Sequence, residues 1–247
     1  MSETGERDLY FISGSPPCWT AMLAMAVKGL AYTPRRLDNA KREQKSPEFL
    51  AVNPRGQVPV LVEGGTPVCE TLAVLAYLDA AHPAPPLFGS SPAETARVWR
   101  TISECDAYLR GPVGQITRPL FRGKGEAFAE QIAEAAEPVR QELAQLETTL
   151  SAQPWLAGET LSAADLATYP VVMQLLRAAG REEAASPRAP GLSARRAFPE
   201  PGRLGRADRG AARLRRRLPA ALEVGGRFSS APILCNRLDG LQIRPFT

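Results

Sequence analysis

The chain has 247 residues, of which 44% are apolar and 23% charged, ordinary proportions for a soluble globular protein of one large or two small domains. Residues 1–8 are polar and acidic, so no secretory signal is visible, and the longest apolar stretch, residues 17–31, is too short to span a bilayer. The four cysteines show neither metal-ligand spacing nor a disulfide framework. We therefore expect a cytoplasmic protein without a membrane segment or a metal site.

The first part of the chain predicts a small α/β unit. Strand patterns alternate with one helix and then form a hairpin before a second helix, which is the β-α-β, β-β-α order of a thioredoxin-like domain. Residues 38–47 are expected to be irregular. The expected strands are residues 8–12 (buried), 32–37, 58–62 and 67–69, and the expected helices are residues 20–30 and 71–82.

The second part predicts helices only. Residues 84–92 form a proline-rich linker, and apolar residues then recur at helical spacing over residues 93–109 and 126–151. A third helix is expected to begin at a capping signature, with Ser162 as cap and Asp165 at the third helical position, and to run to Gly180. The sequence thus divides into residues 1–83, the linker, residues 93–180, and a tail, residues 181–247.

Residues 53–71 indicate a ligand type. They contain a turn at residues 53–56, a strand interrupted by Pro59, and Glu70 and Thr71 directly before a helix that Thr71 can cap. A proline in a strand lies at an edge, at a bulge or in a cis bond, which would leave the backbone of Val58 free to pair with an extended peptide. A strand edge for a peptide backbone beside a helix start for its carboxylate predicts a site for a small peptide.

The same residues resemble the glutathione S-transferase superfamily, whose usual pattern is N-P-x-G-x-V-P-x-L followed by E-S before a helix. The resemblance covers roughly residues 8–180. It implies a thioredoxin-like N-terminal domain (α/β) followed by an all-helical (all-α) C-terminal domain, usually in a homodimer. It also implies glutathione as co-substrate, with no other cofactor, and a hydrophobic electrophile as second substrate.

Ser15 and Cys18 are the catalytic candidates, because Ser15-x-x-Cys18 matches the C-x-x-C frame at the start of the first helix. A serine in the leading position cannot form a disulfide but can donate a hydrogen bond to a bound thiolate and lower its pKa. Serine-type members of the superfamily have a similar S-x-P-C sequence, which implies that Ser15 activates the thiol. If Cys18 faces the site instead, thiol–disulfide exchange becomes possible; a buried helix cysteine is the competing interpretation.

The resemblance implies that Val58 pairs with the cysteinyl backbone of glutathione and that Glu70 and Thr71 hold its γ-glutamyl end. The alternative is that Glu70 and Thr71 only cap the helix. Gln44 or Lys45 could reach the glycyl end or be solvated surface residues. A role in the electrophile pocket or a plain surface role is open to three further residues, Tyr108, Arg110 and Arg118, and His82 is assigned no chemistry.

The tail allows two interpretations. It holds 14 arginines, no lysine and 6 acidic residues, which could form a disordered basic arm, but the arginines have no interleaved aromatic residues to support nucleic-acid binding. Alternatively, reading the codons of residues 198–223 one base later can spell an amphipathic helix that resembles the closing segment of bacterial glutathione S-transferases. We therefore predict a one-base frameshift between about residues 181 and 198.

The sequence as a whole predicts a glutathione transferase of detoxification type. A glutathione-dependent isomerase or thiol reductase would use the same site, and a non-catalytic binding or scaffold protein would keep the fold without turnover.

Overall fold

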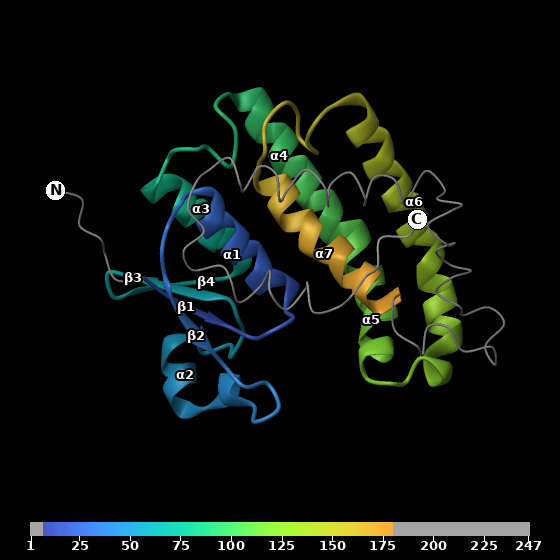
Figure 1. Cartoon of the computed structure of the whole chain (residues 1–247), viewed down its shortest axis with the longest axis horizontal. Helices are drawn as coiled ribbons and strands as arrows, with labels where there is room; N and C mark the ends of the chain where they lie inside the picture. Colours follow the sequence, from blue (N-terminus) through green and yellow to red (C-terminus); the bar gives the residue numbers. More distant parts are fainter. Residues whose placement is uncertain (1–6, 180–247) are drawn as a thin grey trace, which may run out of the picture. The chain divides into compact units, whose positions relative to one another are not determined.

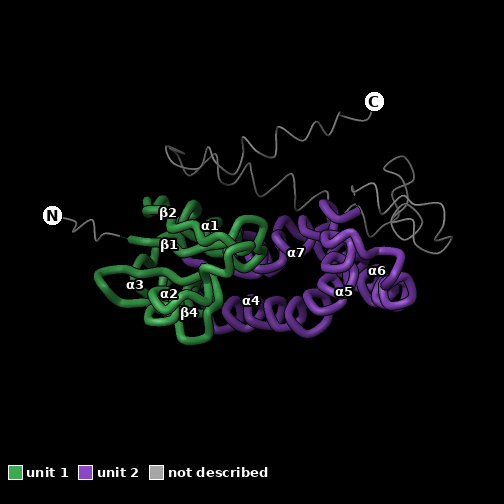
Figure 2. The backbone as a smooth tube through the Cα atoms, turned by 90° about the horizontal axis from the view of Figure 1, so that it is seen from below, with its two compact units in different colours: residues 1–85, 220–247 green, residues 86–219 purple. Residues whose placement is uncertain are grey.

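The computed structural model describes residues 7–179, which form two compact units, residues 7–85 and residues 86–179 (Figure 2). The predictions for the tail, both the basic arm and the frameshift, lie outside the described residues. No helix in the described part of the chain is long and apolar enough to cross a membrane.

The first unit is built on a four-stranded sheet with the order β2-β1-β3-β4. β1 (Arg7–Phe11) pairs in parallel with β2 (Thr33–Arg36) and antiparallel with β3 (Val60–Glu63), which pairs antiparallel with β4 (Thr66–Cys69). α1 (Pro16–Val27) and α3 (Thr71–Ala81) lie on one face of the sheet, and α2 (Pro47–Val52) lies on the other (Figure 1). The predicted thioredoxin-like order is confirmed.

One local prediction for this unit is wrong, and one helix was not predicted. The first strand is not buried throughout, because only Leu9 within it is fully covered. The segment expected to be irregular, residues 38–47, is irregular apart from a 3-10 turn (Glu43–Lys45), but the six-residue helix α2 that follows it was not expected. Its start carries a recognisable signal, since the Oγ atom of Ser46 accepts a hydrogen bond of 3.3 Å from the N–H of Phe49 and Pro47 occupies the first helical position. The segment is too short to show helical periodicity.

The second unit is helical, as expected. A helix predicted to run through residue 109 instead changes at Cys105 into a π-helical turn, and α5 continues where no helix was expected. Gly111, Pro112 and Pro119 lower the helix propensity of α5, whereas tertiary packing of its apolar side stabilises it. The elements are α4 (Pro92–Glu104), the π-helix Cys105–Leu109, α5 (Arg110–Phe121), a 3-10 turn (Glu126–Phe128), α6 (Ala129–Ala152) and α7 (Ala163–Ala179).

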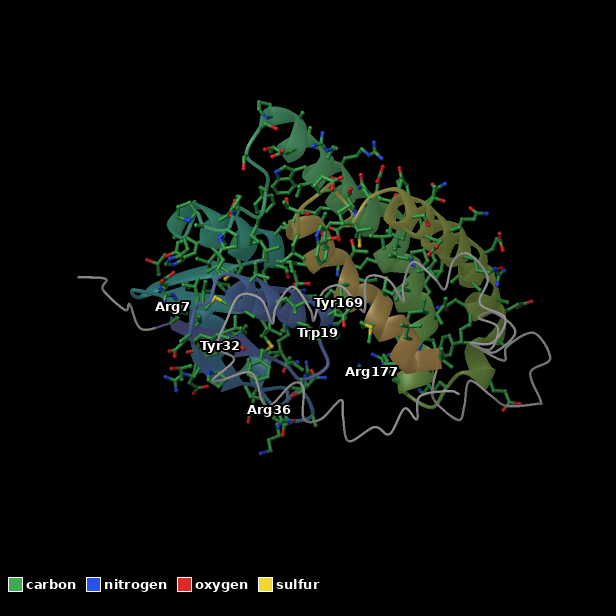
Figure 3. The ribbon with its side chains drawn as sticks, turned by 45° about the horizontal axis from the view of Figure 1, so that its top comes forward. Arg7, Trp19, Tyr32, Arg36, Tyr169 and Arg177 are labelled. Atoms are coloured by element: carbon green, nitrogen blue, oxygen red, sulfur yellow. The ribbon has the colours of Figure 1, made fainter. Side chains whose placement is uncertain are left out.

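The predicted cap of α7 is confirmed. Asp165 is completely buried and accepts hydrogen bonds from the N–H of Leu156 (2.9 Å), the N–H of Ser162 (3.0 Å) and the hydroxyl of Ser162 (3.1 Å). The Ser162 hydroxyl oxygen accepts in turn from the N–H of Ala164 at 3.3 Å. Arg177 lies at the other end of α7 (Figure 3). Its guanidinium is 4.7 Å from the centroid of the Phe121 ring on α5.

Candidate functional site

Three chain segments leave the sheet of the first unit at the same end. Tyr10, Val60 and Cys69 lie in one row across β1, β3 and β4. The chain runs out of this row toward Ser15, enters it from Val58, and leaves it toward Glu70 because β3 is antiparallel to both neighbours. The fold therefore gathers the predicted thiol-activating residue and the predicted peptide-binding residues at one end of the sheet.

Ser15 is the N-cap of α1. Its Oγ atom accepts a hydrogen bond of 3.5 Å from the N–H of Cys18, and its own N–H donates to the carbonyl of Ile12 at 3.3 Å. Because Oγ only accepts in this bond, the half-buried hydroxyl can donate its single proton, either to the adjacent Cys18 side chain or to a ligand. The N-terminal end of the helix dipole favours negative charge at the same point.

Cys18 lies one turn into α1 and is only 1% exposed. Burial raises the pKa of its thiol, although a hydrogen bond with the Ser15 side chain lowers that pKa to a smaller extent. A reactive thiol needs exposure and a lowered pKa, so these properties match a buried structural cysteine better than a nucleophile.

The turn at residues 53–56 is rigidly held. The Asn53 amide donates to the carbonyl of Gln57 at 2.8 Å and accepts from the N–H of Arg55 at 3.1 Å, and the N–H of Gly56 donates to the Asn53 carbonyl at 2.8 Å. Gly56 has a φ of +59°, and a Cβ atom on it would lie 2.5 Å from the carbonyl oxygen of Gln44. Only glycine therefore fits this position.

The turn leads directly into Val58, which precedes β3. The Val58–Pro59 peptide bond is cis, one of the arrangements predicted for Pro59. Pro59 is buried, whereas Val58 is half-buried. Within residues 7–179, neither the N–H nor the carbonyl of Val58 has a hydrogen-bond partner. Val58 thus presents the open backbone that an extended peptide would need.

Glu70, rather than Thr71, occupies the N-cap position of α3, so the predicted capping role of Thr71 is wrong. Thr71 is the first helical residue, and the Glu70 side chain makes no capping hydrogen bond. Glu70 has φ +70° and ψ 129°, a conformation that side-chain-bearing residues rarely adopt. Its exposed carboxylate lies 4.0 Å from the Nε atom of Arg55. The helix start is therefore left without a side-chain cap beside a strained, exposed acidic residue.

Gln44 and Lys45 lie beside the turn at residues 53–56. The Nζ atom of Lys45 donates to the carbonyl of Arg55 at 2.8 Å, and the Nε2 atom of Gln44 donates to Asn39 at 3.0 Å. The Oε1 atom of Gln44 is buried and has no partner in the described part of the chain. Sequence reasoning did not single out Arg55, although its place inside the N-P-x-G turn was the signal that could have found it.

The remaining candidates belong to other elements. Tyr108, Arg110 and Arg118 belong to the helical unit, where Tyr108 is 58% exposed and Arg110 pairs with Asp106 at 2.6 Å. His82 follows α3 and its Nε2 atom lies 3.2 Å from the Glu63 carboxylate. Among residues 7–179, no group of three or more histidine, cysteine or acidic side chains could hold a metal ion.

Comparison with known proteins identifies the family. The glutathione S-transferase N-terminal domain matches residues 9–86, and the C-terminal domain of the same family matches residues 129–194. The chain belongs to the glutathione S-transferase superfamily. The C-terminal match ends inside the interval in which the sequence predicts a frameshift, which stays a prediction.

Three curated relatives and one solved structure show the breadth of this superfamily. Glutathione S-transferase A of Pleuronectes platessa is 30% identical over 72% of this chain and 81% of its own. A maleylacetoacetate isomerase of Pseudomonas aeruginosa is also 30% identical, over 66% of this chain and 78% of its own. FtsZ-localized protein A of Caulobacter vibrioides is 30% identical over 66% of this chain and 74% of its own. A glutathione transferase homologue from Sulfitobacter, solved with bound glutathione, is 25% identical with a TM-score of 0.59, covering 85% of this chain and 97% of its own.

These comparisons show that the chain is a glutathione S-transferase-like enzyme with the expected two-domain fold. In the N-terminal domain of this transferase-like chain, a half-buried hydroxyl, an open backbone and an uncapped helix start lie at one end of the sheet. That combination can hold a peptide in extended form and stabilise a thiolate.

Proposed function

We propose that this chain is a glutathione transferase in which Ser15 activates the glutathione thiol for attack on a hydrophobic electrophile. The observation that carries the proposal is the position of Ser15, Val58 and Glu70 at one end of the same sheet. A peptide-binding edge without the hydroxyl would support binding alone. A hydroxyl without the edge would have no means of positioning the peptide whose thiol it activates.

Glutathione binding would use the backbone first. Val58 would exchange N–H and carbonyl hydrogen bonds with the cysteinyl residue, in the manner of an added strand. Glu70 would accept from the γ-glutamyl ammonium, while the Thr71 hydroxyl and the free N–H groups of α3 would bind its carboxylate. Gln44 and Lys45 flank the turn on which the glycyl end would lie, with Lys45 supplying a positive charge.

The chemistry would then depend on the Ser15 hydroxyl proton. It would donate to the glutathione sulfur and lower the pKa of the thiol, whose proton leaves to water. The thiolate attacks the electrophilic carbon, a C–S bond forms, and the bond to the leaving group breaks; with a chlorinated aromatic, chloride departs. Cys18 is too buried for this attack.

A cis-trans isomerase is the second candidate, favoured by the relative named as a maleylacetoacetate isomerase. The same thiolate would add to a double bond and leave again after rotation, so glutathione would not be consumed. The scaffold alternative keeps the binding edge without turnover. We also propose a homodimer and a cytoplasmic, detoxifying role.

Three assays on the full-length protein distinguish these candidates. The first assay measures glutathione binding by calorimetry. The second measures thioether formation with chlorodinitrobenzene as the electrophile. The third measures isomerisation of a maleyl diketone in the presence of glutathione. We expect binding and thioether formation. Isomerisation without net use of glutathione would favour the second candidate, binding without turnover would favour the scaffold, and absence of binding would contradict all three.

A further inference from the structure

The Arg55–Glu70 pair places two opposite charges at the surface beside the turn at residues 53–56. Nε of Arg55 lies 4.0 Å from Oε1 of Glu70, and the two side chains are 77% and 64% exposed. An exposed pair of this length adds little to stability, because water screens the charges and two long side chains lose freedom. The pair therefore contributes little to the free energy of folding, and both exposed charges are accessible to a ligand.

The backbone of Arg55 is fixed more firmly than its side chain. Its N–H donates to Asn53 at 3.1 Å, and its carbonyl accepts from Nζ of Lys45 at 2.8 Å. A Cβ atom on the next residue, Gly56, would lie 2.5 Å from the carbonyl oxygen of Gln44, and the N–H of Gly56 donates to the Asn53 carbonyl at 2.8 Å. Because the backbone of Arg55 is already fixed, only its side chain has to become ordered when a ligand binds. The conformational entropy lost on binding is therefore smaller than it would be on a flexible loop.

The pair presents a positive and a negative group side by side next to the open backbone of Val58. A γ-glutamyl end carries the complementary arrangement, because its ammonium and carboxylate groups are attached to one carbon. When the ammonium approaches Glu70, the carboxylate can approach the guanidinium, and the four charges alternate in sign. Arginine suits this partner because its planar fork of N–H donors matches a carboxylate.

We propose that Arg55 is a specificity-determining residue that binds the α-carboxylate of the γ-glutamyl group while Glu70 accepts from its ammonium. The inference rests on the proposed glutathione-binding function and adds to it the group that recognises an intact α-amino-acid end. Peptides that lack either charged group would bind more weakly. A plain acyl end has no ammonium for Glu70, and a plain amine end has no carboxylate for Arg55.

Three ligands and two variants test this role on the full-length protein by calorimetry. The ligands are glutathione, its analogue without the α-carboxylate (4-aminobutyryl-Cys-Gly) and its analogue without the ammonium (glutaryl-Cys-Gly). The variants are Arg55→Gln, which removes the charge, and Arg100→Gln, which removes the arginine of another exposed Arg–Glu pair, the one between Arg100 and Glu104 on α4. Thermal unfolding of both variants shows whether they fold as the parent does.

For Arg55→Gln we expect glutathione affinity to fall about tenfold, the size of one hydrogen bond to a charged group. Affinity for 4-aminobutyryl-Cys-Gly should stay within about twofold, since that ligand lacks the group Arg55 contacts. Glutaryl-Cys-Gly keeps the carboxylate and should weaken as glutathione does. Arg100→Gln should leave all three affinities unchanged.

An Arg55→Gln protein that still prefers glutathione over the analogue without the carboxylate, by the parent's ratio, would overturn the inference. So would an equal loss for all three ligands, which indicates a structural role of the turn. A parent protein that binds none of the ligands overturns the proposed function itself, and this outcome is distinct from the other two.

Discussion

The Oγ atom of Ser15 accepts a hydrogen bond from the backbone N–H of Cys18, so both catalytic candidates share the first turn of α1. They differ in environment, since the serine is half-buried at the helix end and the thiol of Cys18 is 1% exposed. This difference separates a group that can reach a ligand from one that packs in the core.

Replacing Ser15 with alanine should lower kcat/KM for thioether formation by about 10- to 100-fold, the equivalent of one lost hydrogen bond to a charged sulfur. The pKa of bound glutathione should rise, so the increase of rate with pH should move to higher pH. Cys18→Ala should keep most of the activity. Activity lost in Cys18→Ala and kept in Ser15→Ala would reverse the assignment.

Ser91→Ala is the matched control for the cap. Ser91 precedes Pro92 as Ser15 precedes Pro16, and its Oγ atom accepts from the N–H of Glu94 at 3.3 Å. Both alanine variants should lose about 1 kcal/mol of unfolding free energy, whereas only Ser15→Ala should lose activity. Equal activity in the two variants would show that Ser15 is a cap and nothing more.

Glu70→Gly should have opposite effects on stability and on binding. Glycine adopts φ +70° readily, so relief of strain should raise the unfolding free energy by about 1 kcal/mol despite the added freedom of the unfolded chain. Glutathione affinity should fall by about tenfold or more, because the partner of the ammonium is removed. Glu70→Gln should weaken binding without the gain in stability. Unchanged affinity in both variants, measured by calorimetry, would exclude Glu70 from the site.

Gly56→Ala should destabilise the protein by about 2–4 kcal/mol in urea unfolding, because a left-handed backbone and an overlap with the Gln44 carbonyl act together. Gly64→Ala is the control, since Gly64 has a φ of +58° with nothing within 4 Å of the added Cβ atom. It should lose only about 1 kcal/mol. Equal losses at both positions would show that the contact between the turn and Gln44 is unimportant.

Asp165 should make stability fall as the pH rises. Burial raises its pKa from 3.8 to about 6, outweighing the hydrogen bonds it accepts. The folded state then holds the proton more tightly than the unfolded state, so the contribution of Asp165 to the free energy of unfolding is fully present below about pH 4 and falls by about 3 kcal/mol between about pH 4 and pH 6. Urea unfolding at several pH values should show the advantage of the parent over Asp165→Asn shrinking across this range. Removing an exposed carboxylate, as in Glu126→Gln, should not change the slope, and a constant difference between parent and Asp165→Asn would contradict the assignment.

Local sequence signals predicted much of the fold. Alternation and helical spacing gave the order of strands and helices in the first unit, and the Ser162–Asp165 pair gave the cap of α7. α2 escaped detection because six residues are fewer than two helical turns. α5 escaped because its glycine and proline residues have low helix propensity, and packing overrides that propensity.

The sequence by itself determined that the chain carries a peptide-binding pattern at residues 53–71 and a serine at the start of the first helix. Turn chemistry and helix capping depend on neighbouring residues, so a pattern read along the chain can predict them. Tertiary structure decided that Cys18 is covered, that Glu70 is held at positive φ, and that Arg55 lies beside it. Burial and the distance between two charges depend on segments that are far apart in the sequence and that the sheet brings together. A pattern read along the chain cannot predict them.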